Sequence, residues 1–180
     1  MNHSLEQRFA QMERRLARLE AERDIMKLFA DYGHAVDAGE EETWVRCFTE
    51  DGHFSAVGPD ESRPPLDVVG RAALRAFAAK HSRRPHLYHQ HGQFESRLKL
   101  DDDATAAACV TYFIVMMRWH PTDPTRHEPV VRSFGRYTDV LVKDTDGAWR
   151  LRSRHADLDA GTRDLPPLAN AMTPGARSPG

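Results

Sequence analysis

The stretch Arg84-Pro-His-Leu-Tyr-His-Gln-His-Gly92 holds three of the ten histidines of the chain and marks a change in sequence pattern. Before it, apolar residues recur with the period of a helix; after it, they alternate with polar residues as in a strand. Successive side chains of a strand point to opposite faces. The two predicted faces carry His86, Tyr88 and Gln90 on one side and Leu87, His89 and His91 on the other. We expect one of these faces to take part in the function.

The pattern on either side of this stretch predicts helices first and strands afterwards. Helices are expected over residues 5–38, 41–48 and 71–81, with a turn at Asp51-Gly52, a short strand at 53–57 and a loop at 58–66. Four long strands are expected over residues 86–100, 104–118, 130–143 and 148–157. Helices segregated from antiparallel strands are typical of the α+β class. We therefore expect three helices to cover one face of a curved antiparallel sheet, which forms a cone with a small-molecule cavity.

The 180 residues divide into three parts: a helical extension at 1–22, a folded domain at 23–158, and a proline-containing tail at 159–180. The extension carries a heptad-like apolar stripe whose members step by four, three, four and three: Leu5, Phe9, Met12, Leu16 and Leu19. This stripe can form an oligomerisation arm, or it can lie on its own domain. Both interpretations stay open from the sequence.

The composition is that of an ordinary globular domain, with 40% hydrophobic residues, 29% charged residues and a net charge of −2. Nothing in this balance favours nucleic acid or an acidic membrane as a partner. The sequence shows no signal peptide and no apolar run of about 18 residues, so a cytoplasmic protein is expected. Cys47 and Cys109 lie in apolar segments, and we expect two buried thiols.

Asp37 interrupts the apolar pattern of the first helix. Spacings of three, four and four place it on one row of the helix with Met26, Phe29 and Gly33. A carboxylate on an apolar row needs a hydrogen bond, a charged partner or a cavity. The alternative is that Asp37 caps the following helix across Ala38-Gly39.

Three groups of residues are candidates for chemistry. His89 and His91 have a spacing that can chelate zinc or iron, but the sequence places no third ligand beside them. His86 can act as a general acid or base if a carboxylate orients it, and Asp37 is the strongest candidate. Arg150, Arg152 and Arg154 are expected on one strand face, opposite Trp149 and Leu151, where they form a solvated surface or bind an anion.

Six segments in a fixed order resemble the SnoaL-like branch of the nuclear transport factor 2-like superfamily, over about residues 20–157. They are Ile25-Met-Lys-Leu-Phe-Ala-Asp-Tyr-Gly-His-Ala-Val-Asp-Ala-Gly39, the set Trp44, Phe48 and Asp51-Gly52, His86-Leu-Tyr-His-Gln90, Gly135-Arg-Tyr-Thr-Asp139, Asp146-Gly-Ala-Trp-Arg-Leu151, and Arg154. The resemblance implies a cone-shaped α+β barrel with a ligand pocket. Its enzymes include scytalone dehydratase, bile-acid dehydratase, a dehydrochlorinase and polyketide cyclases, whereas other members are structural subunits.

The resemblance also implies site residues. Asp37 and His86 match the catalytic pair of the dehydratase-like members, and Tyr32 matches a substrate-contacting tyrosine of that branch. The predicted substrate-binding residues are Tyr88, Gln90, Arg154 and Phe54. Gln90 departs from the family, which has Asn at this position. The resemblance argues against a metal site at His89 and His91, so neither a metal nor another cofactor is expected.

These features predict a cofactor-independent lyase of the dehydratase type, or an isomerase, acting on a small hydrophobic substrate. His86 would abstract a proton from carbon, Asp37 would stabilise the charged imidazole, and Tyr32 or Arg154 would polarise an oxygen. Two alternatives are a non-catalytic binding or assembly subunit, and a polyketide cyclase in which Asp37 is the acid and base. An oligomer is expected, because the outer face of such a sheet usually needs cover, and the resemblance implies a homodimer or homotrimer. His89 and His91 are then expected on the outer or interface face.

Overall fold

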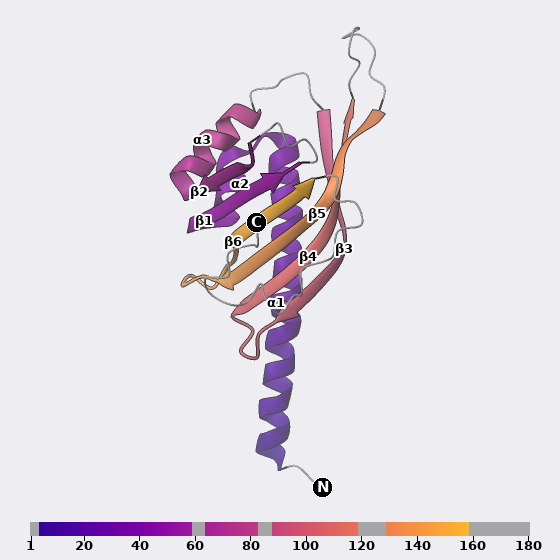
Figure 1. Ribbon diagram of the computed structural model, residues 1–180. Helices are drawn as coiled ribbons and strands as arrows, with labels where there is room; N and C mark the ends of the chain where they lie inside the picture. The colour runs from indigo at the N-terminus through magenta and orange to yellow at the C-terminus, as the bar shows by residue number, and fades with distance from the viewer. Residues whose placement is uncertain (1–3, 59–63, 83–87, 119–128, 159–180) are drawn as a thin grey trace, which may run out of the picture.

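The computed structural model describes residues 4–58, 64–82, 88–118 and 129–158 (Figure 1). The elements in chain order are α1 (Leu5–Ala38), α2 (Glu41–Arg46), β1 (Phe48–Val57), β2 (Leu66–Val69), α3 (Arg71–Ser82), β3 (Tyr88–Leu100), β4 (Ala106–Arg118), β5 (Pro129–Lys143) and β6 (Trp149–Leu158). The predicted tail, residues 159–180, lies outside the described residues. Within the described ranges, no helix is long and apolar enough to cross a membrane.

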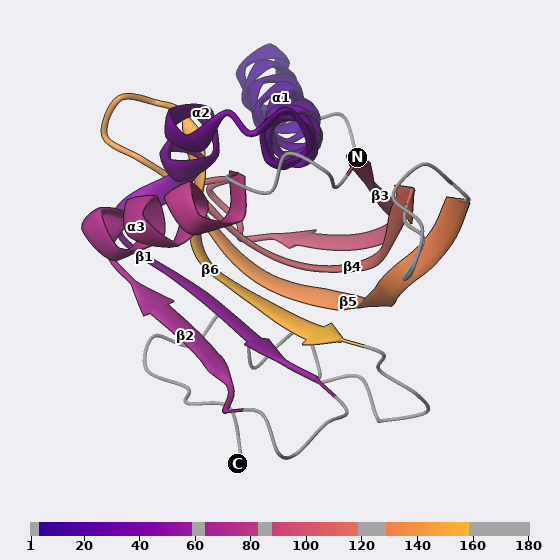
Figure 2. The same cartoon turned by 90° about the horizontal axis from the view of Figure 1, so that it is seen from above.

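The described strands form one curved, open sheet of six strands in the order β2-β1-β6-β5-β4-β3. Figure 2 shows the helices above the concave face of this sheet. The predicted α+β fold is confirmed. The sheet is mixed rather than purely antiparallel, because β1 pairs in parallel with β6. That pairing joins the beginning of the domain to its end, so no local pattern in the sequence indicates it.

Both ends of α1 are set by local interactions. At its start, the hydroxyl of Ser4 accepts a hydrogen bond from the backbone N–H of Gln7, whose side chain accepts one from the backbone N–H of Ser4. Such a reciprocal cap satisfies two backbone groups that the first turn leaves without partners. At its end, Gly39 has a φ of 71°, the left-handed conformation that glycine adopts without strain. The predicted end of the helix is thus confirmed.

The structure corrects three predictions between α1 and α3. The second helix ends at Arg46, two residues before the expected end. Asp51-Gly52 lies inside β1 at a register shift, and a Cβ at Gly52 would lie 2.7 Å from the Cβ of Phe48. Residues 66–69 form β2, antiparallel to β1, where a loop was expected up to residue 66.

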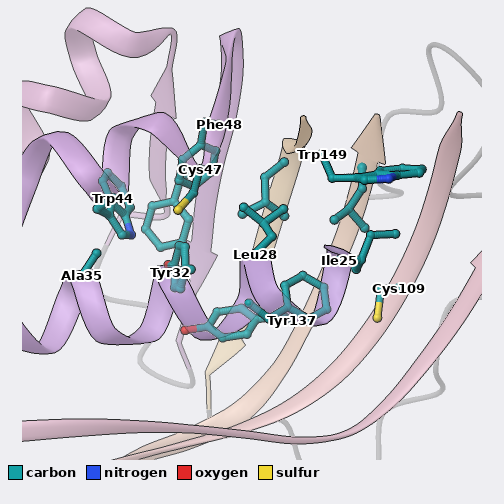
Figure 3. Close-up of a cluster of buried hydrophobic side chains, with 14 of the residues drawn as sticks. Ile25, Leu28, Tyr32, Ala35, Trp44, Cys47, Phe48, Cys109, Tyr137 and Trp149 are labelled. Carbon is teal, nitrogen blue, oxygen red and sulfur yellow. The ribbon is translucent and has the colours of Figure 1, made fainter. Parts of the chain in front are cut away.

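Aromatic side chains fill the space between the helices and the concave face of the sheet (Figure 3). Tyr32 of α1 packs against Trp44 of α2 and Phe48 of β1, with ring centroids 5.9 and 6.1 Å away. On the far side of Tyr32, Tyr137 of β5 stacks on Phe113 of β4 at 4.2 Å. Rings of this size bury much apolar area, and such pairs add about 0.5–1.5 kcal/mol each. This cluster fixes α1 against the sheet.

Both cysteines are buried free thiols, as expected. Burial raises the pKa of Cys47 to about 12 and that of Cys109 to about 11. A thiol with a raised pKa is a poor nucleophile at neutral pH.

Candidate active site

Helix α1 and strand β3 approach closely at Gly33. A Cβ placed at this glycine would lie 3.6 Å from the side-chain nitrogen of Gln93 and 3.9 Å from the Cβ of His91. One turn earlier, the side chain of Gln93 donates a hydrogen bond of 3.0 Å to the backbone oxygen of Phe29. At Gly33, β3 therefore lies close enough to the helix for a Cβ to be in ordinary van der Waals contact with it. One turn further on, the helix presents Asp37.

Asp37 and His91 form the central contact of this region. The Nδ1 atom of His91 lies 2.9 Å from Oδ1 of Asp37. The backbone N–H of His91 donates to the same carboxylate, at 3.1 and 3.0 Å from its two oxygens. The two side chains are 23% and 11% exposed respectively. Asp37 is therefore partnered across the structure, and the alternative that it caps the next helix is wrong, because the N-cap residue there is Glu40.

This geometry assigns the proton on the ring. A carboxylate can only accept hydrogen bonds, so Nδ1 of His91 must carry the hydrogen that it shares with Asp37. In the neutral imidazole the proton then sits on Nδ1, and Nε2 is the unprotonated nitrogen of the ring. A histidine oriented by a carboxylate in this way can act as a general base and afterwards return the proton.

The expectation that His91 lies on the outer face is wrong. His91 pairs in register with Val115 and Gln93 pairs with Phe113, and both of these β4 residues are buried. Gln90, on the opposite face of β3, is exposed and pairs with the exposed Met116. The alternation separates Gln90 from His91, but it does not indicate which of the two faces inward. The pairing of β3 with β4 and its contact with α1 decide that.

The predicted partner of Asp37, His86, lies outside the described residues, and so do the side chains of Tyr88 and His89. The Asp37–His86 pair therefore stays a prediction. Within the described ranges, no group of three His, Cys, Asp or Glu side chains could hold a metal ion.

A buried ion pair joins β5 and β6 next to Tyr32 of α1. The Nε and Nη2 atoms of Arg154 lie 2.8 and 2.7 Å from the two carboxylate oxygens of Asp139, and both side chains are completely buried. The guanidinium also lies 4.2 Å from the ring centres of Tyr32 and Tyr137. Burial acts to lower the pKa of Arg154, but the carboxylate of Asp139 outweighs it and raises this pKa above its usual value. The arginine therefore stays charged.

The prediction that Arg150, Arg152 and Arg154 share a face is wrong. Leu151 pairs with Leu141 but Ser153 pairs with Val140, so β6 has one extra residue at this point. Such a bulge reverses the alternation after it. Arg154 consequently points into the interior on the same side as Leu151. Arg152 is exposed, and Arg150 binds the carboxylates of Asp144 and Asp146.

The Tyr32 hydroxyl lies in a polar environment inside the aromatic cluster. Burial raises the pKa of Tyr32, whereas Arg154 and Trp44 act to lower it. Tyr32 is therefore a neutral phenol that can donate a hydrogen bond. Arg154 and Trp44 act on Tyr32 as hydrogen-bond donors, although no bond from Nη1 of Arg154 or Nε1 of Trp44 has full hydrogen-bond geometry. These buried donors converge on the Tyr32 oxygen, which makes this phenol a candidate for binding an oxygen atom of a ligand.

Phe54, predicted to contact substrate, is buried in the same aromatic cluster, with its ring 5.9 Å from Trp44 and 5.6 Å from Phe77.

A cavity of about 390 Å³ opens elsewhere, between α1, α2 and the turn from β5 to β6. Its lining includes Asp24, Lys27, Arg46 and Arg150, and none of the predicted site residues. The predicted site and this cavity are therefore separate.

Sequence reasoning singled out Asp37 but missed His91, Trp44 and Asp139 as site residues. The alternation Tyr137, Asp139, Leu141 offered a signal for Asp139, because it places the carboxylate between two apolar residues on one strand face. A carboxylate in that position needs a buried partner.

The family model of the SnoaL-like domain matches residues 17–155. The chain therefore belongs to the SnoaL-like family, whose members share the nuclear transport factor 2-like fold. No match is found among curated proteins.

Solved structures agree with this assignment. The chain is similar to Rv3472 from Mycobacterium tuberculosis, a protein of unknown function, with 26% identity over 77% of this chain and 76% of that one and a TM-score of 0.62. An NTF2-like protein with a cystatin-like fold from Novosphingobium aromaticivorans is 20% identical over 96% of this chain and 99% of that one, with a TM-score of 0.68. A protein proposed to be a scytalone dehydratase, from the same organism, is 20% identical over 84% and 95%, with a TM-score of 0.63. The last two likenesses concern the fold alone.

Proposed function

We propose that this protein is a cofactor-independent lyase of the dehydratase type, or an isomerase, that uses Asp37 and His91 as its acid–base pair. The observation that carries the proposal is the hydrogen bond between these side chains at the contact of α1 and β3. In this proposal His91 takes the role expected of His86, whose own pairing with Asp37 stays a prediction.

In the proposed elimination, Nε2 of His91 takes a proton from a carbon next to a carbonyl group. The electron pair of that C–H bond forms a double bond as the C–O bond to a hydroxyl group breaks. The imidazolium then gives its proton to the departing hydroxide, so water leaves and the neutral histidine returns. Asp37 stabilises the charged ring in between. An isomerase would return the proton to a different carbon of the substrate.

The carbonyl oxygen of the substrate would bind to the Tyr32 hydroxyl, toward which Arg154 and Trp44 donate. Tyr32 and Asp37 lie five residues apart on α1, which is about 7.5 Å along the helix axis and about 140° around it. Phe54 and its aromatic neighbours support an apolar substrate body, and Tyr88 stays a proposed contact. Gln90 does not enter the proposal, since it is exposed on the face opposite His91.

The experiment follows water loss from a panel of small aromatic and alicyclic β-hydroxy ketones, together with deuterium uptake from D2O, by NMR. His91→Gln and Asp37→Asn should each lower the rate on any converted compound by about 100-fold or more, the usual contribution of a general base. His86→Gln is the matched control and should keep most of the activity. Loss of activity in His86→Gln with retention in His91→Gln would show that the base is His86. Sensitivity to Asp37→Asn alone would favour a cyclase in which Asp37 acts directly.

A non-catalytic subunit is the second candidate, favoured by one observation. The interior described around Tyr32 is filled by aromatic rings and by the Asp139–Arg154 pair. For this candidate, no compound of the panel would be converted and His91→Gln would change stability only.

A further inference from the structure

The first half of α1 carries an apolar stripe that the described part of the chain leaves uncovered. Its five members, Leu5, Phe9, Met12, Leu16 and Leu19, are between 54% and 73% exposed. Figure 1 shows this end of the helix extending past the sheet, toward the N-terminus. A row of large apolar side chains in water marks an interaction surface.

The stripe is distinct from the face with which α1 packs on its own domain. The buried positions of the helix begin at Ala21 and continue through Ile25 and Leu28. Arg18 makes an early contact with the domain, donating to the backbone oxygen of Asp101 at 2.9 Å. Met26 continues the stripe and is 41% exposed, although the helix is docked at that level. The alternative that the stripe lies on its own domain is therefore wrong for the described structure.

The spacing of the stripe is that of a coiled-coil seam. In heptad notation, Leu5, Met12 and Leu19 occupy d positions, and Phe9 and Leu16 occupy a positions. The helix is capped at Ser4, so the seam is helical from its first residue. The seam extends about 21 Å along the axis, at 1.5 Å per residue.

The charges beside the seam identify the partner and its direction. The g positions hold Arg8 and Arg15, and the e positions hold Glu6, Glu13 and Glu20. In a parallel pair in register, each g residue faces the e residue five positions later on the other chain. Arg8 then faces Glu13, Arg15 faces Glu20, and both contacts occur twice by symmetry. An antiparallel pair would bring glutamates against glutamates, which is unfavourable.

We propose that residues 5–19 of α1 form a parallel two-stranded coiled coil with the same segment of a second copy of this chain. The apolar seam supplies the attraction, and the e and g charges select the parallel orientation. The two domains then lie at the same end of the coiled coil. The proposal does not depend on the proposed enzymatic function, since the seam lies in the segment that projects away from the domain.

A cross-linking experiment on the full chain tests this orientation. Leu5→Cys places a thiol at a d position, where the two copies meet in a parallel pair and lie far apart in an antiparallel one. Mild oxidation should convert most of this variant to a species of twice the 20.4 kDa chain mass. Arg14→Cys, at the f position on the outside of the helix, is the matched control and should stay largely uncross-linked. The two native thiols are buried and should not interfere.

A charge exchange tests whether the stated pairs select the partner. The double variant Arg8→Glu with Arg15→Glu makes the flanks acidic, and Glu13→Arg with Glu20→Arg makes them basic. Carrying different tags, the two variants should capture each other at least tenfold better than either captures itself. Equal capture in all combinations, or a Leu5→Cys protein that stays at the chain mass, would overturn the proposal. The second result would fit an antiparallel pair, or a seam covered by another part of the same chain.

Discussion

Two pairs of acidic and basic side chains in this protein differ in burial, in hydrogen bonding and in their ability to exchange protons. Asp139 and Arg154 are completely buried, and two hydrogen bonds join them in a planar fork. Asp37 and His91 keep limited access to solvent, and one ring nitrogen joins their side chains. The guanidinium is permanently charged, whereas an imidazole can gain and lose a proton near neutral pH.

We therefore expect the Asp139–Arg154 pair to stabilise the fold and the Asp37–His91 pair to transfer protons. A buried arginine held by two bonds and enclosed by aromatic rings cannot exchange protons, so Arg154 can hold Tyr32 and Tyr137 in place and donate hydrogen bonds, but it cannot act as an acid or base. The imidazole of His91 is fixed at Nδ1 by a carboxylate, so Nε2 is the nitrogen that can take up a proton. Mutations of the first pair should therefore change stability most, and mutations of the second should change proton transfer most.

The largest effect on stability should come from Arg154→Met. It leaves the carboxylate of Asp139 buried without its counter-charge, which typically costs about 3–5 kcal/mol of unfolding free energy. Urea denaturation followed by circular dichroism measures the loss. Adding Asp139→Leu to the same chain removes the stranded charge and should recover a large part of the loss. A single variant as stable as the wild type would mean that the pair does not organise the core.

A smaller effect is expected from Asp37→Asn. The amide still accepts the backbone N–H of His91 but lacks the charge that strengthens these hydrogen bonds. The expected loss is about 1 kcal/mol, the difference between a charged and a neutral acceptor. Denaturation under the same conditions as for Arg154→Met gives the comparison directly. The contrast between the two pairs would fail if Asp37→Asn destabilised the protein more than Arg154→Met.

The smallest effect concerns His155, a histidine bonded to a neutral group. Its Nδ1 atom lies 2.8 Å from the Ser55 hydroxyl, and partial burial lowers its pKa below the usual value. As the pH falls below about 6.5, His155 therefore takes up a proton in the unfolded chain before it does so in the folded protein. This stabilises the unfolded chain relative to the folded protein. The unfolding free energy should decrease from pH 7.5 to pH 5.5. His155→Gln should reduce this decrease, and an unchanged decrease would contradict the assignment.

Much of the fold could be predicted because helices and long strands have local signatures. The three helices, the four long strands and the glycine after α1 all follow from periodicity and end signals. Strand β2 was missed because its four residues acquire strand structure only by pairing with β1. The parallel pairing of β1 with β6 has no local signature either.

The site was predicted in part, and the failures share a cause. Asp37 could be identified because a carboxylate on an apolar helix row needs a partner. His91 could not, since the inward face of β3 depends on its pairing with β4. Arg154 was assigned to the wrong face because one extra residue in β6 reverses the alternation. A shift of one residue in a strand exchanges its faces, and such shifts are set by neighbouring strands.

The tautomer of His91 tests the central claim most directly. The protein is labelled with nitrogen-15 in its histidines, and His91→Gln identifies the signals of His91. Spectra are recorded at about pH 8.5, above the usual titration range of histidine. If Asp37 orients the ring, the neutral imidazole carries its proton on Nδ1 and shows an unprotonated Nε2. A ring protonated on Nε2 in the wild-type protein would contradict the Asp37–His91 pair and the mechanism built on it.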